Sequence, residues 1–182
     1  MSRRPVAAGF SLVEVMVTVV VLGVLGSMDG SAMVALLRDQ RLRAGSETLV
    51  AWLEEQRRRA IQTARSCTIE VVGASGLLRP LAGTNACGSI PPFVLAEVSG
   101  SSVRLCASAS GPTQTAPACT GTSGTGSLSI VLTPRGTSTT DALLQLAITG
   151  HSPNRCVQLI APLGLLRPGQ VINGRCDWSS AF

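Results

Sequence analysis

The sequence contains no tyrosine and no lysine, and only 3% of its residues are aromatic. Proteins that hold single-stranded nucleic acids usually stack the bases on aromatic rings, so a stacking platform of that kind is excluded. All basic residues apart from one histidine are arginine, and the formal net charge is only +5 over 182 residues. This is the composition of a mildly basic protein, without the dense charge of a dedicated nucleic-acid binder.

The usual signatures of a catalytic site are also missing. The only histidine, His151, stands in a GHSP stretch typical of a turn, and no G-x-S-x-G motif accompanies it. No glycine-rich run has the spacing of a phosphate-binding or dinucleotide-binding loop. Asp141 and Asp177 are isolated acids, and no cysteine pair has the C-x2-C spacing of redox catalysts and many zinc sites. We therefore expect a protein that is not an enzyme and has no cofactor or metal.

The six cysteines all follow the apolar N-terminal segment of the chain. An even number confined to this part predicts disulfides formed in an oxidising compartment. Several pairings are possible, and we favour the sequential one (first with second, third with fourth, fifth with sixth) because short loops close at the smallest entropic cost. The cysteines are Cys67, Cys87, Cys106, Cys119, Cys156 and Cys176.

An almost unbroken apolar segment runs from Phe10 to Met28, with Glu14 as its only charged residue. A helix of this length approaches the thickness of a bilayer core. Two arginines precede it, so the positive-inside rule keeps the N-terminus in the cytoplasm. A secretory signal would need small residues for cleavage after the run, whereas here the small residue, Gly9, stands before it. Cleavage at Gly9 would leave the apolar helix on the mature chain.

Residues 9–14, GFSLVE, resemble the type III signal sequence of type IV prepilins and pseudopilins. The resemblance implies that a prepilin peptidase cuts between Gly9 and Phe10 and that the new N-terminal Phe10 is methylated. Glu14 would then face the amino group of a neighbouring subunit's Phe10 and set the axial register of the filament. A carboxylate in an apolar helix is costly unless it is paired. The alternative is a polar residue that reaches the membrane interface.

We expect the helix to continue to Arg65, because no proline interrupts residues 10–65. Glycines leave a bend near residues 26–30 open. The pairs Glu54–Arg58 and Glu55–Arg59 have the favourable i,i+4 orientation, so the arginine run 57–59 is interpreted as a solvated face. The opposite face is predicted to be buried from the recurrence of small and apolar residues every three or four positions. These are Leu42, Gly45, Leu49, Trp52 or Leu53, Gln56, Ala60 and Ala64.

After residue 66, short β-prone stretches alternate with clusters of Gly, Ser, Thr and Pro, which predicts a β-rich head. The stretch 108–126 is predicted to be a loop. GLLRP occurs at 76–80 and at 164–168, and both copies are interpreted as arms of hairpins. The predicted strands are Cys67–Val72, Phe93–Val98, Ser102–Ala107, Ser127–Thr133, Leu143–Thr149 and Arg155–Ala161.

The order of these parts is similar to the GspH/FimT group of minor pilins. The helix-to-strand junction at 53–72, the P-R-G turn with its following strand at 132–148 and the closing hairpin at 154–176 carry this resemblance. The DNA-binding branch of that group has G-R-x-R in the closing hairpin. Here the matching stretch is GLLR, so only Arg167 fits, with Arg175 nearby. One or two arginines per subunit would give weak, salt-dependent DNA binding at best.

Together, these patterns and resemblances predict an α+β, pilin-like fold in which a long N-terminal helix, its hydrophobic half inserted in the membrane, packs on an antiparallel β-rich head. The expected parts are a leader (1–9), a transmembrane or filament-core helix (10–36), an amphipathic helix (37–65) and a periplasmic head (66–182). The resemblance implies a minor pilin or pseudopilin of the inner membrane, single-pass before it joins a filament, with prepilin peptidase and other pilins as partners. The alternatives are a DNA-binding minor pilin for natural transformation and a pseudopilin of type II secretion.

Overall fold

The structure is a computed structural model that describes residues 9–28, 30–72, 77–81, 87, 90–95, 103–109, 115–117, 119 and 127–179. Two helices, α1 (Leu12–Met28) and α2 (Gly30–Thr63), precede the strands. The chain divides into two compact units, residues 1–37 and residues 38–182. The second unit contains most of α2 and all of the described strands.

Helix α1 is apolar on all sides. The carbonyl of Ser11 accepts hydrogen bonds from the backbone N–H groups of Glu14 and Val15, at 3.0 and 3.2 Å, so Ser11 occupies the N-cap position that serine favours. The Thr18 hydroxyl donates to the Val15 carbonyl at 2.8 Å and is satisfied within the helix. Large apolar side chains from Leu12 to Val24 are 50–72% exposed. A helix that is apolar on all sides is usually surrounded by other apolar groups, such as neighbouring helices or lipid.

Within the described residues, no helix combines the length and the apolarity that crossing a membrane requires. The single-pass helix expected at 10–36 therefore stays a prediction. Asp29 and residues 1–8 of the expected leader lie outside the described residues.

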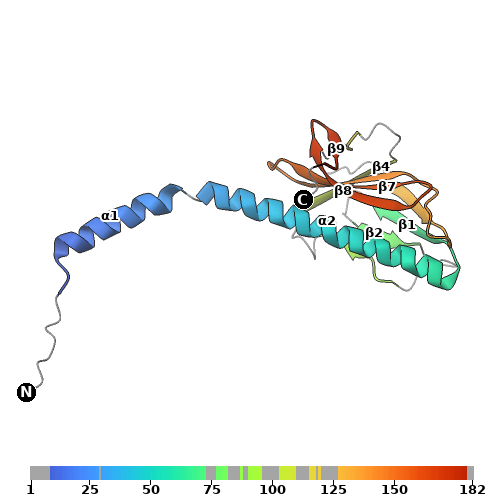
Figure 1. The fold of residues 1–182 in the computed structure, drawn as a ribbon, viewed down its shortest axis with the longest axis horizontal. Helices are drawn as coiled ribbons and strands as arrows, with labels where there is room; N and C mark the ends of the chain where they lie inside the picture. Colours follow the sequence, from blue (N-terminus) through green and yellow to red (C-terminus); the bar gives the residue numbers. More distant parts are fainter. Residues whose placement is uncertain are drawn as a thin grey trace, which may run out of the picture. The chain divides into compact units, whose positions relative to one another are not determined.

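The strands of the second unit form two antiparallel sheets (Figure 1). The first sheet has the order β3-β2-β1-β5, and the second has the order β4-β6-β7-β8-β9. The first sheet consists of β1 (Cys67–Val72), β2 (Leu77–Pro80), β3 (Phe93–Val94) and β5 (Ser127–Leu132). The second consists of β4 (Val103–Ala109), β6 (Ala142–Ile148), β7 (Asn154–Ile160), β8 (Leu165–Ile172) and β9 (Arg175–Asp177).

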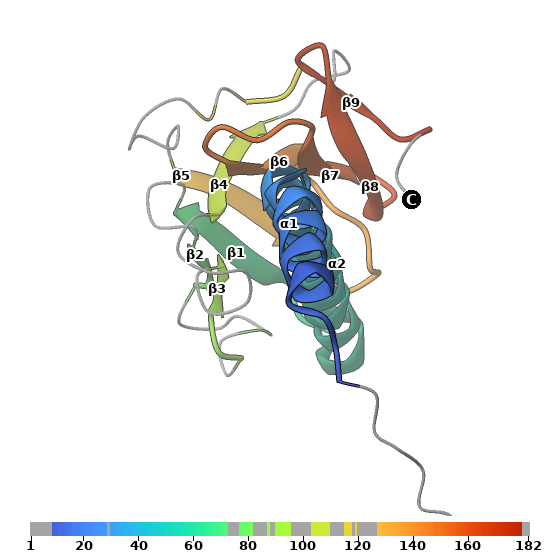
Figure 2. The ribbon, with the colours of Figure 1, turned by 90° about the vertical axis from the view of Figure 1, so that its left-hand side faces the viewer.

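One hydrophobic core joins α2 to both sheets. Figure 2 views the chain along α2 and shows strands of both sheets beside this helix. In β1 buried and half-buried residues alternate, as expected for a strand with one face on a core. Burial of such apolar side chains is the main term that stabilises the head. The largest buried side chains of this core are Leu42, Leu49 and Leu53 from α2, Ile69, Leu78 and Ile130 from the first sheet, Leu95 just after β3, and Leu105, Leu144, Leu146 and Leu159 from the second sheet.

The second sheet also buries part of its other face, which we call the outer face. All seven residues of β6 are buried, so this strand is covered on both sides. On the outer face, Leu143 packs with Cys156 and Cys176, and the half-buried Val171 and Trp178 adjoin them. The end of β9 lies close to Gly169: a Cβ at this position would lie 2.5 Å from the Asp177 carbonyl oxygen and 3.1 Å from Trp178 Cδ1. Glycine at 169 therefore makes room for Asp177 and Trp178.

Three disulfides close the second unit in the sequential pattern. Cys67 is joined to Cys87, Cys106 to Cys119 and Cys156 to Cys176, with Cα–Cα distances of 5.3, 5.7 and 6.0 Å. The third disulfide connects β7 to β9 across the intervening β8. Such cross-links restrict the unfolded chain and thereby stabilise the folded head.

The predicted α+β class, a helix packed on antiparallel sheets, is confirmed. Strand β1 has its predicted bounds, and β4 to β7 lie within two residues of theirs. Only Phe93–Val94 forms β3, while residues 96–98 of the predicted strand, residue 102 and most of the predicted loop 108–126 lie outside the described residues. Strands β2, β8 and β9 were not predicted, although both LLRP stretches do form hairpin arms, in β2 and β8.

Three details of α2 differ from the sequence-based expectation. The helix ends at Thr63, and Ala64 is exposed with a φ of 51°, so its predicted place on the buried face is wrong. A residue in this left-handed conformation is a common helix terminator. Glu54 pairs with Arg57 at 3.5 Å rather than with Arg58, although the predicted Glu55–Arg59 pair is present at 3.1 Å. Trp52 is half-buried at the edge of the core rather than within it.

Candidate functional site

The residues on either side of the expected cleavage point lie outside any helix or strand. Gly9 and Phe10 precede α1, and Phe10 is 82% exposed. A Cβ added at Gly9 would meet no atom within 4 Å. The fold therefore does not require glycine at this position, and a need for glycine here would have to come from another protein.

Glu14 is an acidic residue in the first turn of α1. With Ser11 as the N-cap, Glu14 is three residues further on, which is the spacing of a capping box. A negative charge is favoured at this end of a helix by the helix dipole. The side chain is exposed, so its carboxylate is open to a partner outside the chain. The first turn of α1 is therefore a position where an acidic residue is tolerated.

The two candidate DNA-binding arginines are not brought together. Arg167 lies in β8 opposite Gln158, whereas Arg175 lies in β9 opposite Ile172 of β8. Positions 167 and 172 are five residues apart along one strand, about 16 Å at the usual rise. Because their separation is an odd number of residues, their side chains point to opposite faces of the sheet. A single phosphate-binding pair is therefore not formed.

The surroundings of each arginine also weaken a phosphate site. The Arg167 guanidinium carbon lies 5.9 Å from the centroid of the Trp178 ring, a cation–π contact. Arg175 shares a pocket of about 510 Å³ with Asp177 and Trp178. The Ser179 hydroxyl, 2.7 Å from Asp177 Oδ1, and then the Ser179 N–H hold the pKa of Asp177 below its ordinary value. The resulting carboxylate opposes binding of an anion beside Arg175.

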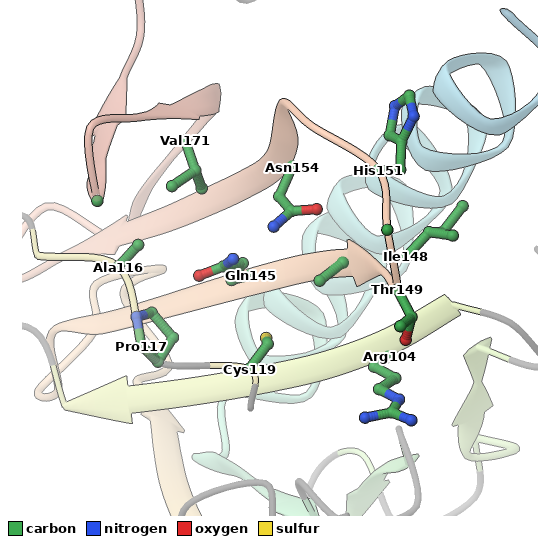
Figure 3. A pocket seen from close by; sticks show the side chains of 13 residues that line it. Arg104, Ala116, Pro117, Cys119, Gln145, Ile148, Thr149, His151, Asn154 and Val171 are labelled. Carbon is green, nitrogen blue, oxygen red and sulfur yellow. The ribbon is translucent and has the colours of Figure 1, made fainter. Parts of the chain in front are cut away.

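A second pocket, of about 620 Å³, lies on the outer face of the second sheet and was not predicted from the sequence (Figure 3). Its lining comes from β4, β6, β7, β8, the turns that follow β6 and β8, and residues 116, 117 and 119. Gln145 of β6 stands in the middle of the lining residues in Figure 3. The sequence gives no signal for it, because Gln145, His151 and Asn154 belong to no motif. Among the described residues, no group of three His, Cys, Asp or Glu side chains could hold a metal.

Comparison with known proteins identifies the N-terminal segment. Residues 4–28 match the prokaryotic N-terminal methylation motif. No curated protein matches the chain. Among solved structures, the crystal structure of the type IV minor pilin FimU of Pseudomonas aeruginosa is similar, with 13% identity over 79% of this chain and 97% of that chain and a TM-score of 0.48. The motif match confirms the N-terminal resemblance predicted from residues 9–14: the chain carries an N-terminal methylation motif ahead of an α+β head.

Proposed function

We propose that the protein is a minor pilin or pseudopilin that a prepilin peptidase processes and that then takes part in the assembly of a type IV pilus-type filament. The observation that carries this proposal is the methylation motif at residues 4–28 together with the apolar helix α1. The apolar surface of α1 is covered by nothing in the described chain. Lipid before assembly and the helices of other subunits after assembly would both cover it.

Glu14 has a defined part in this proposal. In a bundle of apolar helices its carboxylate needs an opposite charge, and cleavage before Phe10 creates a terminal ammonium four residues away in sequence. The ammonium of a neighbouring subunit would supply this charge and would set the axial position of one helix against the next. The disulfide-bonded head would form the outside of the filament.

The decisive experiment is to express the chain with a prepilin peptidase and measure its intact mass. The expected product begins at Phe10 and carries one added methyl group. Gly9→Leu should block cleavage, although the fold tolerates a side chain there. Gly23→Leu is the matched control, because a Cβ at Gly23 also meets no atom within 4 Å. Unchanged processing of Gly9→Leu would refute the proposal.

DNA capture for natural transformation remains a weaker alternative. It rests on the resemblance around Arg167, and the separation of Arg167 from Arg175 does not favour it. A pseudopilin of type II secretion would have the same N-terminal features as a pilus subunit. Deletion of the gene separates a pilus subunit from a secretion pseudopilin. Loss of pili would support the role in pilus assembly, and loss of secretion with intact pili would support the role in type II secretion.

A further inference from the structure

The pocket on the outer face of the second sheet has an unusual polar floor. Three of its lining residues carry a buried polar atom for which the described chain offers no hydrogen-bond partner: Gln145 Oε1, Asn154 Oδ1 and His151 Nε2. Gln145 as a whole is only 5% exposed. Buried polar groups are nearly always hydrogen-bonded, because leaving them without a partner is costly. Three such atoms around one pocket point to a ligand that the chain itself does not contain.

Two disulfides hold this floor in place. Gln145 is directly opposite Cys106 on β4 and Cys156 on β7, so its side chain lies between the two bridges on the outer face. The lining residues Ala116 and Cys119 are both attached to the second sheet or its turns. The Ala116 N–H donates to the Gly174 carbonyl at 2.9 Å, and Cys119 is bonded to Cys106. A pocket held in this way loses little freedom when a ligand binds.

The chemistry of the lining selects the class of ligand. None of the described lining residues is acidic, which disfavours a metal ion or an amine, and none is phenylalanine, tyrosine or tryptophan, the residues that most often stack on a base. Arg104 is the one arginine among them, too little for a polyanion. A carboxamide turns easily about its terminal torsion and can present either its oxygen or its nitrogen. Hydroxyl groups both donate and accept hydrogen bonds, so they match Gln145 and Asn154 in either orientation.

The shape of the pocket favours a compact ligand over a peptide strand. Strand β6, which carries Gln145, pairs with β4 on one side and with β7 on the other, so this strand offers no free edge to a peptide. A volume of about 620 Å³ lies in the range of small-molecule sites. We propose that this pocket binds a neutral, hydroxyl-rich ligand, a mono- or disaccharide, through the carboxamides of Gln145 and Asn154. The proposal is independent of filament assembly.

The test uses the ¹⁵N-labelled full chain in a zwitterionic detergent, because maltoside and glucoside detergents carry the proposed ligand class. N-acetylglucosamine, glucose and maltose are titrated, with inorganic phosphate and a neutral dipeptide amide as the other chemical classes. The expected result is a saturable shift of the side-chain amide signals of Gln145 and Asn154 with at least one saccharide. No shift with any saccharide overturns the proposal, and a shift with the dipeptide amide alone replaces it with a peptide site.

Variants locate the binding. Gln145→Leu should weaken it about tenfold, the effect of losing one or two hydrogen bonds. Gln158→Leu is the matched control, because Gln158 is 7% exposed on the same outer face and also has an unpartnered Oε1 within the described chain, yet it does not line the pocket. Equal weakening by the two variants would overturn the proposal. Asn154→Ala provides the same test if Gln145→Leu fails to fold, as thermal unfolding would show.

Discussion

Arg155 on β7 donates hydrogen bonds from Nη2 to both carboxylate oxygens of Asp39 on α2, at 3.1 and 3.3 Å. The two residues are 116 positions apart in sequence. The Arg155 side chain is 7% exposed and that of Asp39 is 36% exposed, so the pair lies at the margin of the head. Asp39 is also the second residue of the unit that contains the head. The pair therefore ties the beginning of this part of α2 to the second sheet.

Removing the Asp39 charge should destabilise the head, because the largely buried Arg155 guanidinium would lose its anion. For Asp39→Asn we expect the free energy of unfolding to fall by about 1–3 kcal/mol. This is less than for a fully buried pair, because Asp39 is partly exposed. Chemical denaturation of the two proteins measures it. Glu47→Gln is the control, because its pair with Arg43 is exposed on both sides and should contribute less than about 1 kcal/mol. Equal effects of the two substitutions would contradict the assignment.

A side chain at Gly169 should displace the segment that follows β9. Gly169→Ala places a methyl group 2.5 Å from the Asp177 carbonyl oxygen and 3.1 Å from Trp178 Cδ1. We expect overpacking to lower the free energy of unfolding by about 1–3 kcal/mol. Trp178 should also become more exposed. In a Trp52→Phe background Trp178 is the only tryptophan, and its emission reports the change. Gly23→Ala, with no atom near the added methyl, should leave stability unchanged or raise it.

Loss of the Glu14 carboxylate should separate processing from assembly. Glu14→Ala is expected to be cleaved and methylated but to enter filaments poorly, because the subunit's register depends on the charge pair. Immunoblots of sheared filaments, compared with the membrane fraction, measure entry. Thr18→Ala, one turn further along α1, is the control, since its hydroxyl already bonds to its own helix. Entry of Glu14→Ala at the wild-type level would contradict the role of this carboxylate.

DNA binding by the full chain should be weak and only slightly salt-dependent. With one or two phosphate contacts, a plot of log affinity against log salt should have a slope no steeper than about −2. Because Arg167 and Arg175 lie on opposite faces, we expect at most one of Arg167→Ala and Arg175→Ala to lower the slope. Arg79→Ala serves as the control, since Arg79 pairs with Glu70 through Nε at 2.8 Å. A steep slope that both substitutions reduce would support DNA capture instead.

Features that depend only on neighbours along the chain can be predicted from the amino-acid sequence. The N-terminal motif is a local pattern of a glycine, a phenylalanine and a glutamate before an apolar run, and residues 4–28 match it. The buried face of α2 follows from a period of three to four residues, which correctly identified Leu42, Leu49, Leu53, Gln56 and Ala60. The even number of cysteines predicted disulfides, and this prediction also needs no knowledge of the fold.

Features that depend on strand register follow only from the three-dimensional fold. Strand β8 contains a proline and β9 is only three residues long, so neither has a clear local signal, and they form because β7 and the Cys156–Cys176 bridge hold them. Register also decides that Arg167 and Arg175 face opposite sides of the sheet. It brings Gln145 between two disulfides and Asp39 to Arg155. A shift of one residue in a strand exchanges its faces, and sequence periodicity cannot fix that shift between strands far apart in the chain.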